Sequence, residues 1–276
     1  WSSDVCSSDL SKGIEKGGTL PPLDYFKKLA AETIGGKALR AIKPDLYARA
    51  EAKAGREAEE AALAKDLPAA RDAKVKRVVF AGSSSEYGDS PTLPKVESMP
   101  NAPKSPYALQ KVVGEEYCRL FTELYGLETV SIRYFNVFGP RQQPNSPYSG
   151  VISLFIKALS TGATPKIHGD GGQTRDFTYV ANVVDGVLRA CTAPKAVGHA
   201  INVATNGRVS LLQLLESLNR HMGTNAVPEF GPTREGDVRD SQASIERARE
   251  LLGYTPIISF DEGLKRTVEW YRSSQS

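Results

Sequence analysis

KRVVFAG (residues 76–82) and LETVSIRYFNVFG (residues 127–139) are two apolar runs, and the segment between them has the start and stop residues of a helix. Each run contains β-branched and aromatic residues and ends in glycine, which is typical of a strand buried in a parallel sheet. Between the runs, Ser105 and Pro106 provide an N-cap and a first-turn proline, and Gly126 provides a C-terminal stop. A strand, a helix and a strand at this spacing predict a βαβ unit with parallel strands and a right-handed crossover.

Composition is typical of a globular protein and excludes several classes. Of the 276 residues 40% are hydrophobic and 24% are charged, and 35 basic against 32 acidic side chains give a net charge of +3. This charge is too small for a nucleic-acid binder, and no apolar run approaches the roughly 18 residues of a membrane span. Three widely spaced cysteines and three histidines argue against a disulfide scaffold and a metal site. We therefore expect no nucleic acid, membrane or metal partner, and a reducing, cytoplasmic compartment.

The first 68 residues differ from the remainder. WSSDVCSSDL (residues 1–10) has neither periodicity nor the regions of a signal peptide. It resembles the conceptual translation of a sequencing adapter, and a disordered natural terminus is the alternative. Residues 47–67 hold eight alanines and alternating charges, which favours an exposed helix over a coiled-coil partner because heptads are missing. Because the chain begins with tryptophan, we interpret it as a fragment, a processed chain or an artefact.

Tyr107 and Lys111 are four residues apart on the expected helix, so they share one face with about 5–6 Å between their side-chain bases. A lysine ammonium near a phenol favours the phenolate, and such a tyrosine can act as a general acid or base. Taken alone, this pair is more often a pair of surface neighbours. Its position after a serine-rich loop that follows a strand indicates a binding site, since ligands of open α/β sheets bind beyond the carboxyl ends of the strands.

Six motifs occur in one order along the chain. They are SSSEYGD (83–89), SPYALQK (105–111), IRYFNVFGPRQ (132–142), HGDGGQTRDFTYV (168–180), REGDVRDS (234–241) and RELLGYTP (249–256). With these motifs, residues 69–276 resemble the extended short-chain dehydrogenases/reductases, and among them the UDP-glucose and UDP-N-acetylglucosamine 4-epimerases. The joint occurrence of the motifs is far more specific than any one of them.

The resemblance implies NAD-dependent epimerisation at carbon 4 of a UDP-hexose. Tyr107 would remove the proton of the 4-hydroxyl while hydride passes to NAD, and the keto sugar would rotate and take the hydride back on its other face. Ser83 would hydrogen-bond the 4-oxygen and relay the proton. Lys111 would support the phenolate and bind the cofactor ribose, and Phe135 would contact the nicotinamide region. The implied substrate-binding residues are Ser84, Ser85, Asn136, Arg175, Arg234 and Asp237.

The alternative chemistry within this family is that of the sugar-nucleotide 4,6-dehydratases. These enzymes eliminate water with adjacent Asp and Glu side chains in the loop after the first strand of the unit. Ser84 and Ser85 stand at those positions here, and hydroxyls cannot form that acid/base pair near neutral pH. The sequence therefore favours epimerisation. The small serines leave room for an N-acetyl group, so glucose and its N-acetylated relative both remain open.

The glycine-rich turn G-x-x-G-x-x-G, which binds the NAD pyrophosphate in this family, does not occur in the sequence. We therefore expect an α/β protein with a Rossmann-type parallel sheet that lacks its N-terminal cofactor half, and a smaller mixed substrate domain. HAINVAT (199–205) predicts a further strand, and Ser210 predicts a helix cap. The expected parts are residues 1–10 (artefact), 11–68 (non-matching and helical), 69–139 with 182–222 (Rossmann remainder), and 140–181 with 223–276 (substrate domain).

Two interpretations of this chain follow. It is either the carboxyl portion of a UDP-sugar 4-epimerase whose front was lost in sequencing or assembly, or a non-catalytic remnant that exists as written. In both, the catalytic activity of the chain itself is in doubt. The resemblance implies a homodimer for an intact member, which pairs through the helix with Tyr107 and its predecessor. Because that predecessor is missing, dimerisation of this chain is doubtful.

Overall fold

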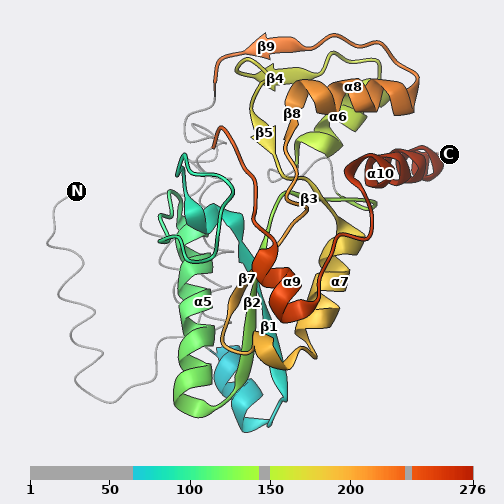
Figure 1. Ribbon diagram of the computed structural model, residues 1–276. Coiled ribbons are helices and arrows are strands. Elements are labelled where there is room, and N and C mark those ends of the chain that lie inside the picture. Colours follow the sequence, from blue (N-terminus) through green and yellow to red (C-terminus); the bar gives the residue numbers. More distant parts are fainter. Residues whose placement is uncertain (1–64, 143–149, 234–237, 276) are drawn as a thin grey trace, which may run out of the picture. The chain divides into compact units, whose positions relative to one another are not determined.

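The computed structural model describes residues 65–142, 150–233 and 238–275 (Figure 1). The chain divides into two compact units, residues 1–59 and 60–276, and the described residues all belong to the second. The predictions for residues 1–64 therefore lie outside the described residues. Within the described ranges, the helices are too short or too polar to cross a lipid bilayer.

A parallel sheet carries the predicted βαβ unit. In the described residues it has the order β1 (Arg77–Ser83), β2 (Glu128–Tyr134), β7 (Ala200–Val203), and both pairings are parallel. The helix α5 (Pro106–Tyr125) connects β1 to β2 and packs on both strands. The prediction of an α/β fold with a parallel sheet is confirmed.

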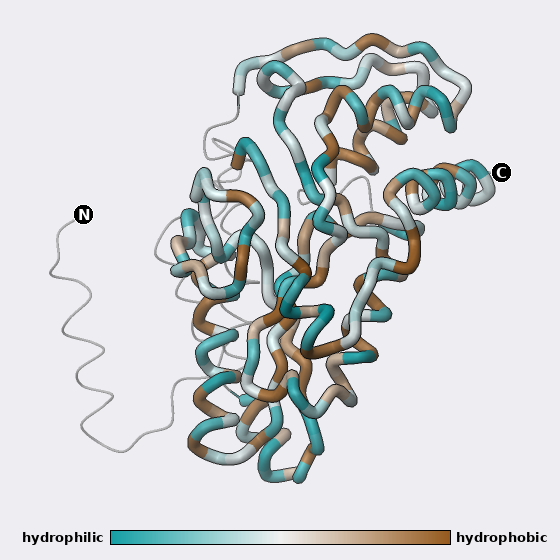
Figure 2. Tube along the Cα trace, in the orientation of Figure 1, coloured by the Kyte–Doolittle hydropathy of each residue, from teal (hydrophilic) through white to brown (hydrophobic). Residues whose placement is uncertain are grey.

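The ends of α5 are those that the sequence predicts. The Ser105 hydroxyl accepts a hydrogen bond from the Ala108 amide, and Pro106 occupies the first turn. Gly126 ends the helix in the left-handed conformation, with φ of 68°. Hydrophobic and hydrophilic stretches alternate along the helix, as in other amphipathic helices (Figure 2). These local signals place Tyr107 in the first turn of α5.

Two details of the strand predictions are wrong. β1 is half-buried rather than buried, because it is an edge strand of the described sheet and has a paired neighbour on one side only. The run 127–139 is not one strand, because β2 ends at Tyr134. The chain then turns through Asn136, whose φ is 33°, and enters β3 (Val137–Phe138), which pairs with a strand of another sheet.

The described residues contain three hydrophobic clusters, of which two are large and the third is a small one that includes Leu67. The first surrounds the parallel sheet and includes Val130, Ile132 and Ile201. The second contains buried side chains of three helices, α6 (Val151–Ser160), α8 (Leu211–Met222) and α10 (Phe260–Gln275). Ser210 caps α8 as predicted, in a reciprocal capping box with Gln213.

The remaining described elements contribute to one cluster or the other or lie at their edges. They are η1 (Ser84–Tyr87), β4 (Lys166–His168), β5 (Thr174–Arg175), β6 (Thr178–Tyr179), α7 (Val180–Ala190), η2 (Pro194–Ala196), β8 (Val209–Ser210), β9 (Glu229–Gly231) and α9 (Glu246–Leu252). The pairings β3–β6, β4–β9 and β5–β8 form three two-stranded sheets. Through β3 and β6, the segment that follows β2 is held beside the start of α7.

Candidate functional site

One cavity brings together most of the side chains that the sequence singled out. It has a volume of about 500 Å³ and lies beyond the carboxyl ends of β1 and β2. Seven predicted site residues line it: Ser83, Ser84, Ser85, Tyr107, Phe135, Asn136 and Arg175. Lys111 is not among the lining residues but lies one turn from Tyr107 on α5. Arg234 and Asp237 lie outside the described residues.

Ser83 occupies the junction between β1 and η1. Its backbone is extended and it caps η1, so its Oγ accepts hydrogen bonds from the Ser85 amide at 3.2 Å and from the Ser85 hydroxyl at 2.9 Å. A hydroxyl oxygen has two lone pairs and one proton. Because these contacts use the Ser83 oxygen as an acceptor, its O–H is left to donate to a ligand in the cavity.

Tyr107 and Lys111 hold a phenol and a cation close together, as the spacing of four residues predicts. The Tyr107 side chain is 38% exposed and lines the cavity. The Lys111 ammonium lies 5.6 Å from the centre of the Tyr107 ring and 5.5 Å from the centre of the Phe80 ring on β1. Both distances are within the range of a cation–π contact. The positive charge is therefore fixed on the helix face beside the phenol.

Asn136 and Arg175 reach the cavity from elements that follow β2. Asn136 stands at the break between β2 and β3, and its side-chain amide donates to the Ser241 hydroxyl at 3.4 Å. Arg175 on β5 donates from Nη1 to two backbone carbonyls, those of Thr174 and Arg239, each at 2.9 Å. These bonds fix the guanidinium at the cavity wall. Paired guanidinium donors suit a phosphate group.

Phe135, which follows β2, also lines the cavity. Its side chain is fully buried in the cluster around the parallel sheet, and its ring centre lies 6.2 Å from that of Tyr87. Phe135 is therefore a core residue of that cluster that also lines the cavity.

Asp176 is a buried carboxylate that braces the cavity wall. It accepts hydrogen bonds from the Thr205 amide at 3.0 Å, the Thr205 hydroxyl at 2.6 Å and the Ala243 amide at 3.1 Å. Burial raises the pKa of Asp176, and these hydrogen bonds oppose that effect. The three bonds tie the neighbour of Arg175 to the segment after β7 and to the segment that carries Ser241.

Sequence reasoning missed several lining residues. Tyr134 and Val137 lie within the IRYFNVFGPRQ motif, and Val238 and Ser241 lie within REGDVRDS, so motif membership was the available signal. Lys95 had no such signal, because it comes from a loop without a recognised motif. Its ammonium donates to the Ser90 carbonyl, and burial lowers the pKa of Lys95.

The charges around the cavity are of one sign in the described residues. Lys95 and Arg175 line it, and no aspartate or glutamate does. Two cationic side chains in the wall of a cavity favour an anionic ligand. The arrangement can therefore hold a negatively charged group while presenting a hydroxyl donor and a phenol to the remainder of the ligand.

Comparison with known proteins identifies the family to which this chain is similar. Residues 22–204 match the model of the NAD dependent epimerase/dehydratase family. The matched range begins well before residue 69, so it includes part of the segment that the motifs left unmatched. The chain is 43% identical over 206 residues to a UDP-glucose 4-epimerase of Mycolicibacterium smegmatis, covering 74% of this chain and 65% of the relative.

Solved structures of UDP-sugar 4-epimerases are also similar to this chain. A UDP-N-acetylglucosamine 4-epimerase of Methanobrevibacter ruminantium, in complex with UDP-N-acetylmuramic acid, is 34% identical with a TM-score of 0.74, covering 88% of this chain and 74% of the other. A UDP-glucose 4-epimerase of Thermotoga maritima, with UDP-glucose, is 34% identical with a TM-score of 0.73, covering 76% and 68%. This chain belongs to the NAD-dependent epimerase/dehydratase family.

Proposed function

We propose that this cavity binds a UDP-hexose and that its side chains serve NAD-dependent epimerisation at carbon 4. The observation that carries the proposal is the meeting of a hydroxyl donor, Ser83, and a phenol, Tyr107, in one cavity with the cation Arg175. A sugar hydroxyl and a diphosphate are the two groups that such a set suits. Relatives that bear the names of UDP-glucose and UDP-N-acetylglucosamine 4-epimerases support the same substrate class.

Each side chain has a stated task in this proposal. Ser83 donates its hydrogen bond to the sugar 4-oxygen, and Tyr107 takes the proton of the 4-hydroxyl and later returns it. Lys111 stabilises the phenolate with its positive charge. When bound, NAD would supply the hydride acceptor, and we assign its nicotinamide end to the neighbourhood of Tyr107, Lys111 and Phe135. The proposed substrate ligands are Ser84, Ser85, Asn136, Arg175, Arg234 and Asp237.

Replacing Tyr107 with phenylalanine tests the reaction. With UDP-glucose and millimolar NAD, we expect Tyr107→Phe to lower the rate of UDP-galactose formation by about 10²- to 10⁴-fold, because the proton carrier is lost. UDP-glucose affinity, measured by calorimetry, changes by about twofold or less. Tyr117→Phe is the matched control, since Tyr117 is also exposed on α5 but does not line the cavity. Equal rates for Tyr107→Phe and the wild type, or no UDP-glucose binding by the wild type, contradict the proposal.

The affinity for NAD is a separate prediction. Because the sequence contains no G-x-x-G-x-x-G turn, we expect the dissociation constant of NAD to lie above the micromolar range. Titration of the purified chain, followed by nicotinamide fluorescence of NADH or by calorimetry with NAD, measures it. Micromolar binding contradicts this expectation and shows that other residues hold the pyrophosphate. Binding of UDP-glucose without turnover favours the non-catalytic alternative.

The setting of the reaction belongs to the same proposal. The substrate is a small, charged metabolite of the cytoplasm, so we place the protein there. The resemblance leads us to expect an intact family member to pair as a homodimer through α5 and the helix before it, and size-exclusion chromatography with light scattering tests this for the present chain. The small Ser84 and Ser85 side chains admit both a hexose and its N-acetylated form.

A further inference from the structure

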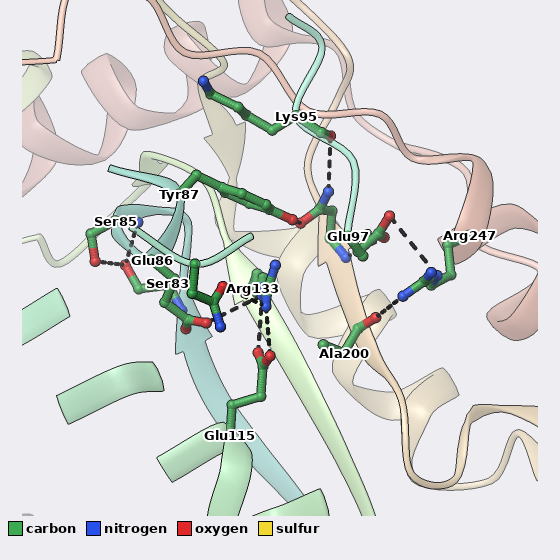
Figure 3. A network of polar contacts seen from close by, with 12 residues as sticks. Ser83, Ser85, Glu86, Tyr87, Lys95, Glu97, Glu115, Arg133, Ala200 and Arg247 are labelled. Carbon is green, nitrogen blue, oxygen red and sulfur yellow. Dashed lines mark hydrogen bonds and ion pairs between the residues drawn. The ribbon is translucent and has the colours of Figure 1, made fainter. Parts of the chain in front are cut away.

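A buried carboxyl group lies directly behind Ser83. The Glu86 side chain is 0% exposed, and its Oε1 accepts a hydrogen bond from the Ser83 backbone amide at 2.9 Å. The Ser83 hydroxyl in return caps the Glu86 amide, which completes a reciprocal capping box around η1. Figure 3 shows Glu86 between Ser83 and the guanidinium of Arg133. The Ser83 backbone is therefore held on one side by its pairing with Tyr134 of β2 and on the other by this carboxyl group.

That carboxyl is braced from two further elements. Arg133 on β2 contacts Glu86 at 3.2 Å through Nε and binds Glu115 on α5 at 2.9 Å and 2.5 Å through Nε and Nη2. The same guanidinium donates to Asn101 at 3.1 Å and lies 4.7 Å from the centre of the Tyr87 ring. Side chains from η1, β2 and α5 thus converge on one buried cation, as Figure 3 shows.

Space for the Glu86 carboxyl is limited by the backbone around it. A Cβ atom on Gly82 would lie 3.1 Å from Glu86 Oε1 and 3.1 Å from the Ile132 carbonyl oxygen. Both separations are shorter than ordinary van der Waals contacts. The carboxyl is consequently packed against the end of β1, with little freedom to change its position.

We propose that Glu86 is a positioning residue for Ser83: its carboxyl accepts the Ser83 amide and, braced by Arg133 and Glu115, fixes the Ser83 hydroxyl at the cavity. This inference rests on the role of Ser83 in the proposed function. It concerns how the site is held in place, because Glu86 itself does not line the cavity.

The charges of the cluster indicate which form of Glu86 does this. Two carboxyl groups, from η1 and α5, face one guanidinium from β2, so full ionisation would leave a net negative charge in the interior. Burial, and then the charge of Glu115, raise the pKa of Glu86 to about 8, while Arg133 opposes the shift. Glu86 therefore keeps its proton at neutral pH, and its ionisation above that range places two anions together behind Ser83.

The free energy of unfolding should depend on pH through the ionisation of Glu86. The folded protein retains a proton on Glu86 that the unfolded chain releases near its ordinary pKa of 4.5. Between about pH 4.5 and about 8, the unfolded state therefore binds fewer protons, and stability falls as pH rises. The contribution is fully present below this window and is lost above it. The unfolding equilibrium constant of the wild type should rise by about tenfold per pH unit relative to that of Glu86→Gln.

Two substitutions, Glu86→Gln and Glu86→Val, distinguish a role in holding Ser83 from a general role in folding. Glutamine keeps an oxygen acceptor for the Ser83 amide and cannot ionise, whereas valine removes the acceptor. In nuclear magnetic resonance spectra, we expect the Ser83 amide proton of the wild type to shift with pH, with a midpoint near 8, and that of Glu86→Gln to stay constant. Glu250→Gln, at an exposed position of α9, is the control and should retain the wild-type midpoint.

The pH dependence of kcat tests whether the ionisation of Glu86 affects the reaction in the cavity. We expect the rate constant kcat of the wild type to fall above pH 8 and that of Glu86→Gln to remain level, with Glu86→Val about tenfold slower at every pH and KM changed little. A Ser83 amide that does not titrate, or that titrates equally in Glu86→Gln, overturns the inference. If the wild type does not bind UDP-glucose, the proposed function fails, and the amide titration still decides the role of Glu86.

Discussion

Arg133→Met should lower the free energy of unfolding by about 3–5 kcal/mol. Arg133 is 2% exposed and is the cation between two buried carboxyl groups, Glu86 and Glu115. Methionine removes that cation while filling much of its volume. The Glu115 carboxylate then loses its partner in a medium that solvates charge poorly, which is the costly way to break a buried ion pair, and the protonated Glu86 loses a polar neighbour. Urea unfolding at pH 7, followed by circular dichroism, measures the change.

Arg119→Met is the matched control for this experiment. Arg119 also contacts two carboxylates, Glu116 and Glu123, but all three side chains are exposed on α5. Surface pairs of this kind contribute about 0–1 kcal/mol, because water solvates the separated charges. If the two arginine variants unfold at the same urea concentration, the buried cluster does not have the stabilising role assigned to it. The two variants share the residue type, the substitution and the number of carboxylate contacts, while Arg133 is buried on β2 and Arg119 is exposed on α5.

Gly88→Ala should be the most damaging glycine substitution near the cavity, with a loss of at least about 3 kcal/mol. Gly88 follows η1 with φ of 59° and ψ of −137°, a conformation that residues with a side chain rarely adopt. A Cβ atom would also lie 2.0 Å from the Ala102 carbonyl oxygen. Because Gly88 lines the cavity, the displaced loop should weaken UDP-glucose binding as well.

Gly126→Ala is the control that separates the cost of a positive φ from the cost of the steric overlap at Gly88. Gly126 also has a positive φ, of 68°, but its Cβ position has no heavy atom within 4 Å. Alanine there costs about 1 kcal/mol, which is the penalty of the left-handed conformation alone. The urea midpoints of the two variants therefore isolate the contact with Ala102. Similar urea midpoints for Gly88→Ala and Gly126→Ala would show that the loop around Gly88 accommodates a side chain without loss of stability.

The local elements are the part of this protein that sequence alone determined. Ser105 with Pro106 begins α5 and Gly126 ends it, and Ser210 with Gln213 begins α8, because caps act through hydrogen bonds between close neighbours in the chain. The pairing of Tyr107 with Lys111 has the same origin, since it follows from helical spacing. The parallel order of β1 and β2 followed from the length of the connection.

Only the tertiary structure decided how distant segments meet. The break at Asn136 arises because β3 pairs with β6, some forty residues later, and no local signal separates it from β2. Lys95 reaches the cavity from a loop, and Asp176 joins Thr205 and Ala243. The burial of Glu86 depends on Arg133 and Glu115, which lie on a different strand and helix. A charged residue in a serine-rich loop looks solvated in the sequence, and its protonation state follows only from the groups that folding places around it.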